Sequence, residues 1–196
     1  MRVGFDVDGV LANFTWAFSR EAHILDPLIP IIGNSAQETW RFPWSNRFYD
    51  KVWDEVDNTY NWWMGLEPLV TQEEINAINF LINNHDVFFI TNRKRTKGYS
   101  AETQTRLWLQ SIGILADHAT VIATNSSKGL LCSALDLETF IDDKPKNVED
   151  ILRDSTTSPC IIDRKYNKEV DTIYRFKTVK DYVEWTIEIS RILDKS

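Results

Sequence analysis

The chain has 196 residues, of which 43% are hydrophobic and 26% are charged, and its formal net charge is −7. This length and composition suit one globular core that carries a small insert. The negative charge argues against a partner such as a long nucleic acid, whose binders normally present a basic face. The first residues do not form a basic segment followed by an apolar one, and no apolar run is long enough to span a bilayer. We therefore expect a cytoplasmic protein without a membrane partner.

Apolar runs of strand length alternate along the chain with amphipathic patterns of helical period. The predicted strands cover residues 3–7, 87–90, 120–123, 139–141 and 160–162, and the predicted helices cover residues 72–83, 101–110, 128–135, 147–152 and 179–193. The strand-like runs do not alternate with polar residues, which is typical of parallel strands that are buried on both faces. Strands that alternate with helices favour an α/β fold with a doubly wound, mainly parallel sheet.

The segment between the first strand and the next helix is far longer than a single crossover requires. We place an α/β core domain at residues 1–11 and 70–196, and an inserted cap at residues 12–69. The cap contains 12 of the 24 aromatic residues and six of the eight tryptophans. We interpret this segment as a small, mainly helical unit that lies over the carboxyl edge of the sheet.

Polar side chains lie at or just beyond the ends of four predicted strands. They are Asp6, Asp8, Thr91, Lys128, Asp142 and Asp143. Ligands of open α/β sheets bind at the carboxyl ends of the strands, so we expect these side chains to meet there. Crowded carboxylates repel one another, and a divalent cation is their natural partner. The ordered set therefore predicts a site for a phosphate group and a divalent metal.

These stretches resemble the motifs of the haloacid-dehalogenase (HAD) superfamily of phosphohydrolases. The first motif of that superfamily, Asp-x-Asp-Gly-(Val/Thr), is matched by residues 6–10, and the residue that closes its second strand is matched by Thr91. The motif-three lysine is matched by Lys128, and the acidic fourth motif by Asp142 and Asp143. The resemblance implies a Rossmann-like core, and the insert lies where this superfamily places its first type of cap.

The resemblance also implies catalytic roles for the two acids of the first motif. Asp6 is the expected nucleophile, whose carboxylate attacks phosphorus and forms an aspartyl-phosphate. Asp8 is expected to protonate the leaving alcohol and later to take a proton from the attacking water. Gly9 is expected to let the backbone turn sharply beside the phosphate.

The other matched residues are expected to hold the phosphate group and Mg²⁺. The expected phosphate ligands are Thr91, Asn92, Arg93 and Lys128. A solvated loop is the competing interpretation of the basic run at residues 93–97, with Arg93 as its strongest candidate for contact with substrate. The expected Mg²⁺ ligands are Asp6, the Asp8 carbonyl and Asp143, with Asp142 beside them, and the reverse order of these last two acids stays open.

Two stretches in and next to the cap resemble the 5′(3′)-deoxyribonucleotidases, namely residues 11–14 and 62–68. This resemblance implies that Phe14 contacts the nucleoside and that other cap aromatics hold the base. We extend this role to Phe42 and Trp44, and to Trp62 and Trp63, for which packing is an equal alternative. A base that stacks on such a ring gains roughly 1–3 kcal/mol per contact.

The function expected from these residues is Mg²⁺-dependent hydrolysis of (deoxy)nucleoside monophosphates. The alternative is a HAD phosphatase that acts on a sugar phosphate or on the 3′-phosphate end of a nucleic acid. A receiver-type signalling domain is disfavoured, because its acceptor aspartate lies on the third strand and it lacks a cap. A catalytically silent binding protein is disfavoured by the complete set of polar residues. The expected partner is a small phosphomonoester, and the sequence leaves a homodimer open.

Overall fold

The computed structural model of the chain describes residues 1–32, 42–170 and 174–193. In these ranges, six strands form one sheet in the spatial order β3-β2-β1-β4-β5-β6. The strands are β1 (Arg2–Phe5), β2 (Asp86–Thr91), β3 (Thr120–Ala123), β4 (Thr139–Asp142), β5 (Ser158–Ile162) and β6 (Arg175–Phe176). Each neighbouring pair is parallel, which confirms the predicted doubly wound α/β fold.

The central strand β1 ends at Phe5, two residues earlier than predicted. The carbonyl of Val7 accepts two backbone N–H groups from farther along the chain, which closes a tight loop after the strand. Gly9 has a φ of 87° within this loop, a conformation that glycine adopts without steric cost. The edge strand β6 was not predicted, because its two residues form no apolar run.

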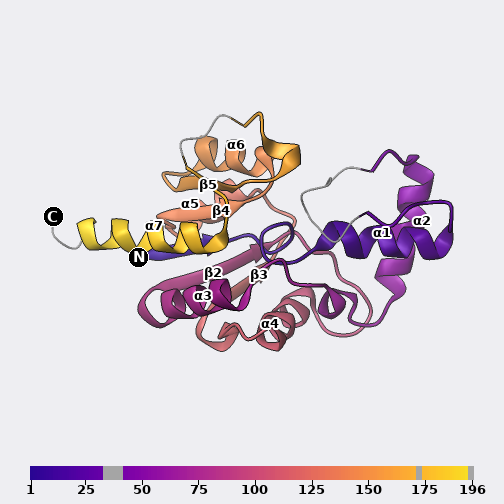
Figure 1. Cartoon of the computed structure of the whole chain (residues 1–196), viewed down its shortest axis with the longest axis horizontal. Helices are drawn as coiled ribbons and strands as arrows, with labels where there is room; N and C mark the ends of the chain where they lie inside the picture. Colours follow the sequence, from indigo (N-terminus) through magenta and orange to yellow (C-terminus); the bar gives the residue numbers. More distant parts are fainter. Residues whose placement is uncertain (33–41, 171–173, 194–196) are drawn as a thin grey trace.

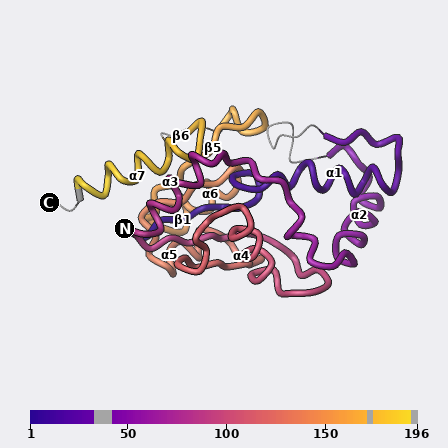
Figure 2. The backbone as a smooth tube through the Cα atoms, turned by 60° about the horizontal axis from the view of Figure 1, so that its bottom comes forward, coloured from indigo at the N-terminus to yellow at the C-terminus, as the bar shows by residue number. Residues whose placement is uncertain are grey.

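Helices cover both faces of the sheet. The helices are α1 (Phe14–Leu25), α2 (Asn46–Asn58), α3 (Gln72–Asn84), α4 (Ala101–Ser111), α5 (Lys128–Ala134), α6 (Pro145–Asp154) and α7 (Val179–Leu193), and the short 3₁₀ turns are η1 (Trp62–Gly65), η2 (Ala116–His118) and η3 (Lys165–Asn167). Helix α3 packs beside α7, and α5 packs beside α6 (Figure 1, Figure 2). Phe89 of β2 belongs to the cluster with α3 and α7, whereas its neighbour Phe88 belongs to the cluster with α5 and α6. Alternate side chains of a strand point to opposite faces, so the two clusters lie on opposite faces.

Local signals fix the starts of the core helices. Thr71 and Glu74 form a capping box at the start of α3, and the Ser100 side chain accepts the backbone N–H of Thr103 at the start of α4. Pro145 occupies the first turn of α6, where its missing N–H costs nothing. The five core helices are confirmed, with ends that differ from the predicted ones by at most two residues.

The helices α1 and α2 and the turn η1 lie beyond the carboxyl edge of the sheet (Figure 1). The chain enters and leaves this region along two adjacent segments. Asn13 donates its backbone N–H to the carbonyl of Glu67 at 2.9 Å, and Leu69 donates to the carbonyl of Leu11 at 2.7 Å. This arrangement suits the cap at residues 12–69, although the division from the core at residues 1–11 and 70–196 stays a prediction. Residues 33–41 of the cap lie outside the described residues.

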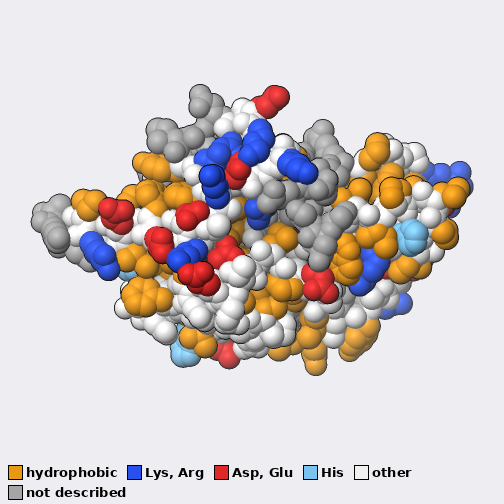
Figure 3. Space-filling view, viewed as in Figure 1, with side chains coloured by type: hydrophobic (Ala, Val, Ile, Leu, Met, Phe, Trp, Pro, Cys, Tyr) orange, Lys and Arg blue, Asp and Glu red, His pale blue; other side chains and the backbone are white. Residues whose placement is uncertain are grey.

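The surface of the described ranges bears on the expected partners. Ile24 and Leu28 of the cap are 67% and 90% exposed, and hydrophobic side chains gather over the cap on the right of Figure 3. An exposed apolar patch suits a protein interface, but nothing in the structure shows what covers it, so the homodimer stays a prediction. No helix in the described part of the chain is long and apolar enough to cross a bilayer.

Candidate active site

The strand order reverses around β1, which lies between β2 and β4. This point is where open α/β sheets bind their ligands. Phe5 pairs with Phe89 of β2 on one side and with Ile141 of β4 on the other. The residues that follow these positions therefore meet at one edge of the sheet. They include Asp6, Thr91 and Asp142, which the sequence placed at strand ends.

Three acids form a buried cluster at this edge. One ligand oxygen of each of Asp6, Asp142 and Asp143 lies within 4.8 Å of the other two. Lys128 comes from the first turn of α5, and its Nζ lies 2.7 Å from Asp6 Oδ1 and 2.6 Å from Asp142 Oδ2. One ammonium group offsets only one of three carboxylates, so the cluster keeps an excess of negative charge.

The pKa values of the cluster reflect this crowding. Burial raises the pKa of Asp6 well above its usual range, and the attraction of Lys128 offsets only part of that effect. Burial also raises the pKa of Asp143, and the neighbouring charge of Asp142 adds to the rise. Burial opposes the charge of Lys128, but Asp142 and Asp6 outweigh it and raise the pKa of the lysine. A bound cation would favour the ionised forms of Asp6 and Asp143 and thus lower both pKa values.

The hydrogen bonds of the two neighbouring acids distinguish their roles. Asp143 Oδ2 accepts the Tyr166 hydroxyl at 2.5 Å, whereas its Oδ1 is buried and has no hydrogen-bond partner among the described residues. Both oxygens of Asp142 accept from Asn147 Nδ2, and Lys128 binds Oδ2 as well. A buried acceptor without a donor is costly, and a divalent cation would satisfy it. The residues therefore fit a divalent metal held by Asp6 and Asp143, with Asp142 bound to Lys128 beside it.

Asp8 is held by a buried arginine. Arg93 Nη2 donates to Asp8 Oδ1 at 2.8 Å, and Arg93 Nε donates to Asp8 Oδ2 at 3.0 Å. Thr91 Oγ1 donates to the same Oδ2 at 2.9 Å, and Arg93 Nη1 donates to Thr105 Oγ1 at 3.0 Å. Burial opposes ionisation of Asp8, but the charge and hydrogen bonds of Arg93 outweigh it and lower the pKa of Asp8. Thr91 and Arg93, both expected to contact phosphate, thus have Asp8 as their partner.

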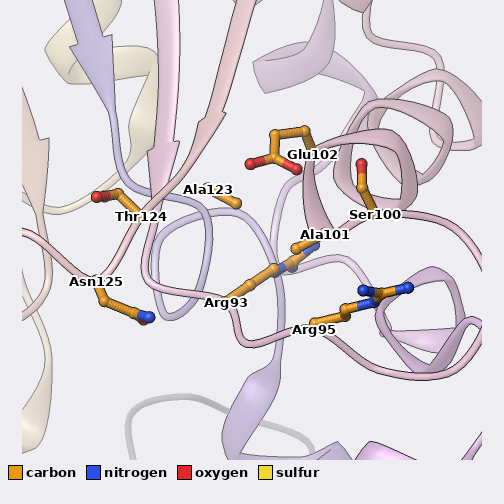
Figure 4. A pocket seen from close by; sticks show the side chains of 8 residues that line it. All are labelled: Arg93, Arg95, Ser100, Ala101, Glu102, Ala123, Thr124 and Asn125. Atoms are coloured by element: carbon orange, nitrogen blue, oxygen red, sulfur yellow. The ribbon is translucent and has the colours of Figure 1, made fainter.

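The rest of the basic run is separate from the acids. Lys94, Arg95 and Lys97 are exposed, as the solvated-loop interpretation predicted, whereas Arg93 is only 3% exposed. A hollow of about 650 Å³ lies beside this run, and Figure 4 shows the side chains around it. Its lining is Arg93, Arg95, Ser100, Ala101, Glu102, Ala123, Thr124 and Asn125. None of the four site carboxylates lines this hollow, so it is not the centre of the chemistry.

An aromatic slot opens above Asp8, between the core and the cap. Its volume is about 200 Å³, and its lining consists of Asp8, Asn92 and Lys144 together with Phe14, Phe18, Phe42, Tyr49, Trp53 and Trp63. Three of the five predicted substrate-binding aromatics therefore line the slot, namely Phe14, Phe42 and Trp63. Six rings around a narrow space that ends at Asp8 suit a planar, apolar group attached to a phosphate.

The other two predicted aromatics do not line the slot. Trp44 stacks on Phe42 with their ring centroids 4.1 Å apart. Trp62 packs edge-on against Trp63 at 4.8 Å, and its Nε1 donates to Glu21 Oε1 at 3.1 Å. Both tryptophans support rings that face the slot. Phe18 and Trp53, which were not among the predicted substrate-binding residues, do line it.

Sequence reasoning missed Lys144, which follows the acidic pair at the end of β4. Lys144 is half-buried and lines both the slot and an adjoining groove of about 600 Å³. Its ammonium group makes no hydrogen bond or ion pair with the residues that the structure describes, although the charges of Asp143 and Asp6 outweigh burial and raise its pKa. A cation that lines the slot and has no direct partner among the described residues is available to an anionic substrate. Its position just beyond a strand end was the signal that could have identified it.

No protein-family model matches the chain, whereas solved structures identify its fold. A HAD-superfamily hydrolase of subfamily IA, variant 1, from Geobacter sulfurreducens superposes with a TM-score of 0.60 at 13% identity, over 94% of this chain and 98% of that one. A HAD family hydrolase from Deinococcus radiodurans, solved with bound phosphate and sodium, superposes with a TM-score of 0.59 at 11% identity, over 95% of each chain. The chain therefore has the fold of the HAD-superfamily hydrolases.

One relative is similar at the level of sequence. It is a protein of Oceanobacillus iheyensis described as "Putative nucleotidase OB0422". The two sequences are 28% identical over 121 residues, which is 61% of this chain and 57% of the relative. The match thus spans little more than half of that protein.

Proposed function

We propose that the protein is a divalent-metal-dependent phosphomonoesterase that hydrolyses nucleoside monophosphates through an aspartyl-phosphate on Asp6. The observation that carries the proposal is the aromatic slot, because it opens onto Asp8 beside the buried acids. The HAD hydrolase fold supports phosphate chemistry, and the neighbour from Deinococcus radiodurans holds phosphate together with a cation. The nucleotidase description of the Oceanobacillus relative supports the class of substrate.

Asp6 supplies the nucleophile. Its carboxylate attacks phosphorus, and the bond between phosphorus and the leaving oxygen breaks. Lys128 binds one oxygen of this carboxylate at 2.7 Å, which orients the group and offsets negative charge as the phosphate approaches. Mg²⁺ held by Asp6, Asp143 and the Asp8 carbonyl would lessen the repulsion between carboxylate and phosphate.

Asp8 moves the protons of the reaction. It protonates the leaving alcohol in the first step and takes a proton from water in the second. Its bonds to Arg93 and Thr91 keep it ionised in this conformation, which suits the second step. The first step requires the Asp8 carboxyl group to leave Arg93 and to carry a proton.

Lys144 and Asn92 are polar side chains that line the slot together with Asp8 and are available to the phosphate. Both also line the adjoining groove, so a phosphate bound beside Asp8 lies within their reach. Thr91 and Arg93 then act on the substrate through Asp8. This assignment gives the phosphate a cation, Lys144, whose ammonium group forms no ion pair with an acid in the described ranges.

The lining of the slot favours a nucleoside over a sugar. A base stacked on aromatic rings gains roughly 1–3 kcal/mol per contact. A sugar phosphate would place several hydroxyl groups against rings that offer few hydrogen-bond partners, and burial of an unpaired hydroxyl costs about 1–3 kcal/mol. Stacking stabilises a bound nucleotide, whereas unpaired hydroxyl groups destabilise a bound sugar phosphate, so the slot favours the nucleotide.

The test is phosphate release from 5′- and 3′-(deoxy)nucleoside monophosphates, sugar phosphates and a 3′-phosphorylated oligonucleotide, each with Mg²⁺ and with EDTA. We expect Mg²⁺-dependent release concentrated on the nucleoside monophosphates. Release only from sugar phosphates or oligonucleotide ends would contradict the proposed substrate and retain the metal chemistry. Release from none of the compounds would contradict the enzymatic function itself.

A further inference from the structure

The turn after β5 forms hydrogen bonds to the backbone on both sides of the acid cluster. This turn lies outside the segments that match the HAD motifs. This turn runs from Arg164 through η3, and it follows a buried strand just as the matched motifs do. Arg164 Nε donates to the Gly9 carbonyl at 3.0 Å, which ties the turn to the loop after β1. Asn167 Nδ2 donates to the Asp143 carbonyl at 2.8 Å, which ties the turn to the end of β4. This one turn therefore fixes both the loop after β1 and the end of β4.

Tyr166 acts on the Asp143 carboxylate itself. Its hydroxyl donates to Asp143 Oδ2 at 2.5 Å, a short bond of the kind expected for an ionised acceptor. The other oxygen, Oδ1, is buried without a hydrogen-bond partner in the described ranges. The same carboxylate belongs to the cluster that fits a metal. One oxygen is thus occupied by the hydroxyl, and one is left for a ligand.

We infer that Tyr166 is a positioning residue that presents a single oxygen of Asp143 to the metal and thereby favours Mg²⁺ over Ca²⁺. This inference rests on the metal site of the proposed function. Mg²⁺ demands near-octahedral geometry, whereas Ca²⁺ also accepts both oxygens of one carboxylate. A hydroxyl that occupies Oδ2 limits Asp143 to one oxygen, which suits the smaller ion. Partners that orient metal ligands in this way typically change metal affinity 10- to 100-fold.

The experiment measures metal binding without substrate. Metal-free wild type, Tyr166→Phe and Tyr182→Phe are titrated with MgCl₂ and with CaCl₂ by isothermal titration calorimetry. Tyr182→Phe is the matched control, because it also loses one hydrogen-bonded tyrosine hydroxyl, which binds Thr139 Oγ1 and the Gly4 carbonyl. We expect Tyr166→Phe to raise the Kd for Mg²⁺ about 10- to 100-fold and the Kd for Ca²⁺ by a smaller factor. The control is expected to change neither Kd.

Two results would overturn the inference. One is an unchanged Kd for Mg²⁺ in Tyr166→Phe, and the other is an equal rise for both ions, which a purely structural role predicts. A crystal structure of the wild type with Mg²⁺ gives a second test that needs no variant. It should show Asp143 Oδ1 on the ion and Oδ2 on the Tyr166 hydroxyl, and both oxygens on the ion would overturn the inference.

The outcomes separate this inference from the proposed function. A wild type that binds Mg²⁺ and a Tyr166→Phe variant that loses Mg²⁺ selectivity would support the inference even if no phosphomonoester is hydrolysed. A wild type that hydrolyses nucleotides, with unchanged metal affinities in the variant, would overturn the inference alone. A wild type that does not bind Mg²⁺ would overturn both.

Discussion

The buried pair of Asp8 and Arg93 gives a stability prediction with a defined magnitude. The side chain of Arg93 is 0% exposed and that of Asp8 is 11% exposed. Asp8→Asn removes the negative charge at nearly constant volume and leaves the guanidinium group buried without a counter-ion. Loss of one partner of a buried ion pair costs about 3–5 kcal/mol. For a chain of this length, each kcal/mol lowers the Tm by about 2–4 °C, so the Tm should fall by roughly 6–20 °C.

The assay is urea denaturation of the metal-free wild type, Asp8→Asn, Arg93→Met and the double variant. The double variant no longer contains an uncompensated ion. Its loss of unfolding free energy should therefore be smaller than the sum of the losses of the two single variants by roughly 1–3 kcal/mol. Asp54→Asn serves as the control, because Asp54 is an exposed acid of α2. The free energy of unfolding of that variant should change by less than about 0.5 kcal/mol.

The pH dependence of the stability lost in Asp8→Asn provides a second check on the ion pair. Arg93 outweighs burial and lowers the pKa of Asp8 in the folded state, so the pair stabilises the fold above the unfolded pKa of about 3.9. This contribution is lost as the pH falls through the lower, folded pKa. The difference in stability between wild type and Asp8→Asn should therefore stay constant from neutral pH to about pH 5 and shrink below about pH 4. Additive losses in the double variant, or a loss below about 1 kcal/mol for Asp8→Asn, would refute the reasoning.

The remaining predictions concern turnover and metal binding. Asp6→Asn should abolish phosphate release without lowering the Tm of the metal-free protein, because it removes a crowded buried charge; full activity would contradict the nucleophile assignment. Gly9→Ala should weaken Mg²⁺ binding in calorimetry at least tenfold, because its Cβ would lie 2.2 Å from Asp143 Oδ2 at a φ of 87°. An unchanged affinity would show that the loop accommodates the methyl group. Phe14→Ala should raise the KM for nucleotides roughly 5- to 150-fold and the KM for a small aryl phosphate much less, as expected from stacking. Equal effects on both substrates would assign Phe14 to packing.

The sequence predicted the sheet and the meeting of Asp6, Thr91 and Asp142 because parallel strands share one carboxyl edge. An apolar run identifies the strand, and the first polar residue after it identifies the edge. This logic does not require knowledge of the loops. The preference for Asp143 over Asp142 as a metal ligand came instead from the resemblance to the HAD motifs, and one oxygen of Asp143 has no hydrogen-bond partner among the described residues.

The pairing of Arg93 with Asp8 could not be predicted from the sequence. The direction of Arg93 depends on rings from distant segments, since its guanidinium group lies 4.8 Å from the Trp63 ring and 5.7 Å from the Trp108 ring. A basic run after a strand is compatible with either an exposed or a buried arginine. Tyr166 was missed for another reason, because its turn follows a fifth strand to which the matched motifs assign no role.

The choice of rings that face the slot was also beyond the sequence. An aromatic-rich insert predicts stacking, but the exposed side of each ring depends on how α1 and α2 cross. Phe14 packs against Phe18 and Trp53 at 5.2 and 6.0 Å, and all three line the slot. Trp44 lies behind Phe42, a position that no local pattern specifies.

The most direct test of the account is to trap the covalent intermediate on Asp6. The protein is mixed with Mg²⁺ and a nucleotide that it hydrolyses, and the reaction is quenched. Borohydride then reduces any acyl phosphate to an alcohol, and peptide mass spectrometry locates the reduced residue. The account predicts conversion of Asp6 to homoserine with Mg²⁺ and no conversion with EDTA. Unmodified Asp6 during rapid turnover, or modification of another acid, would contradict it.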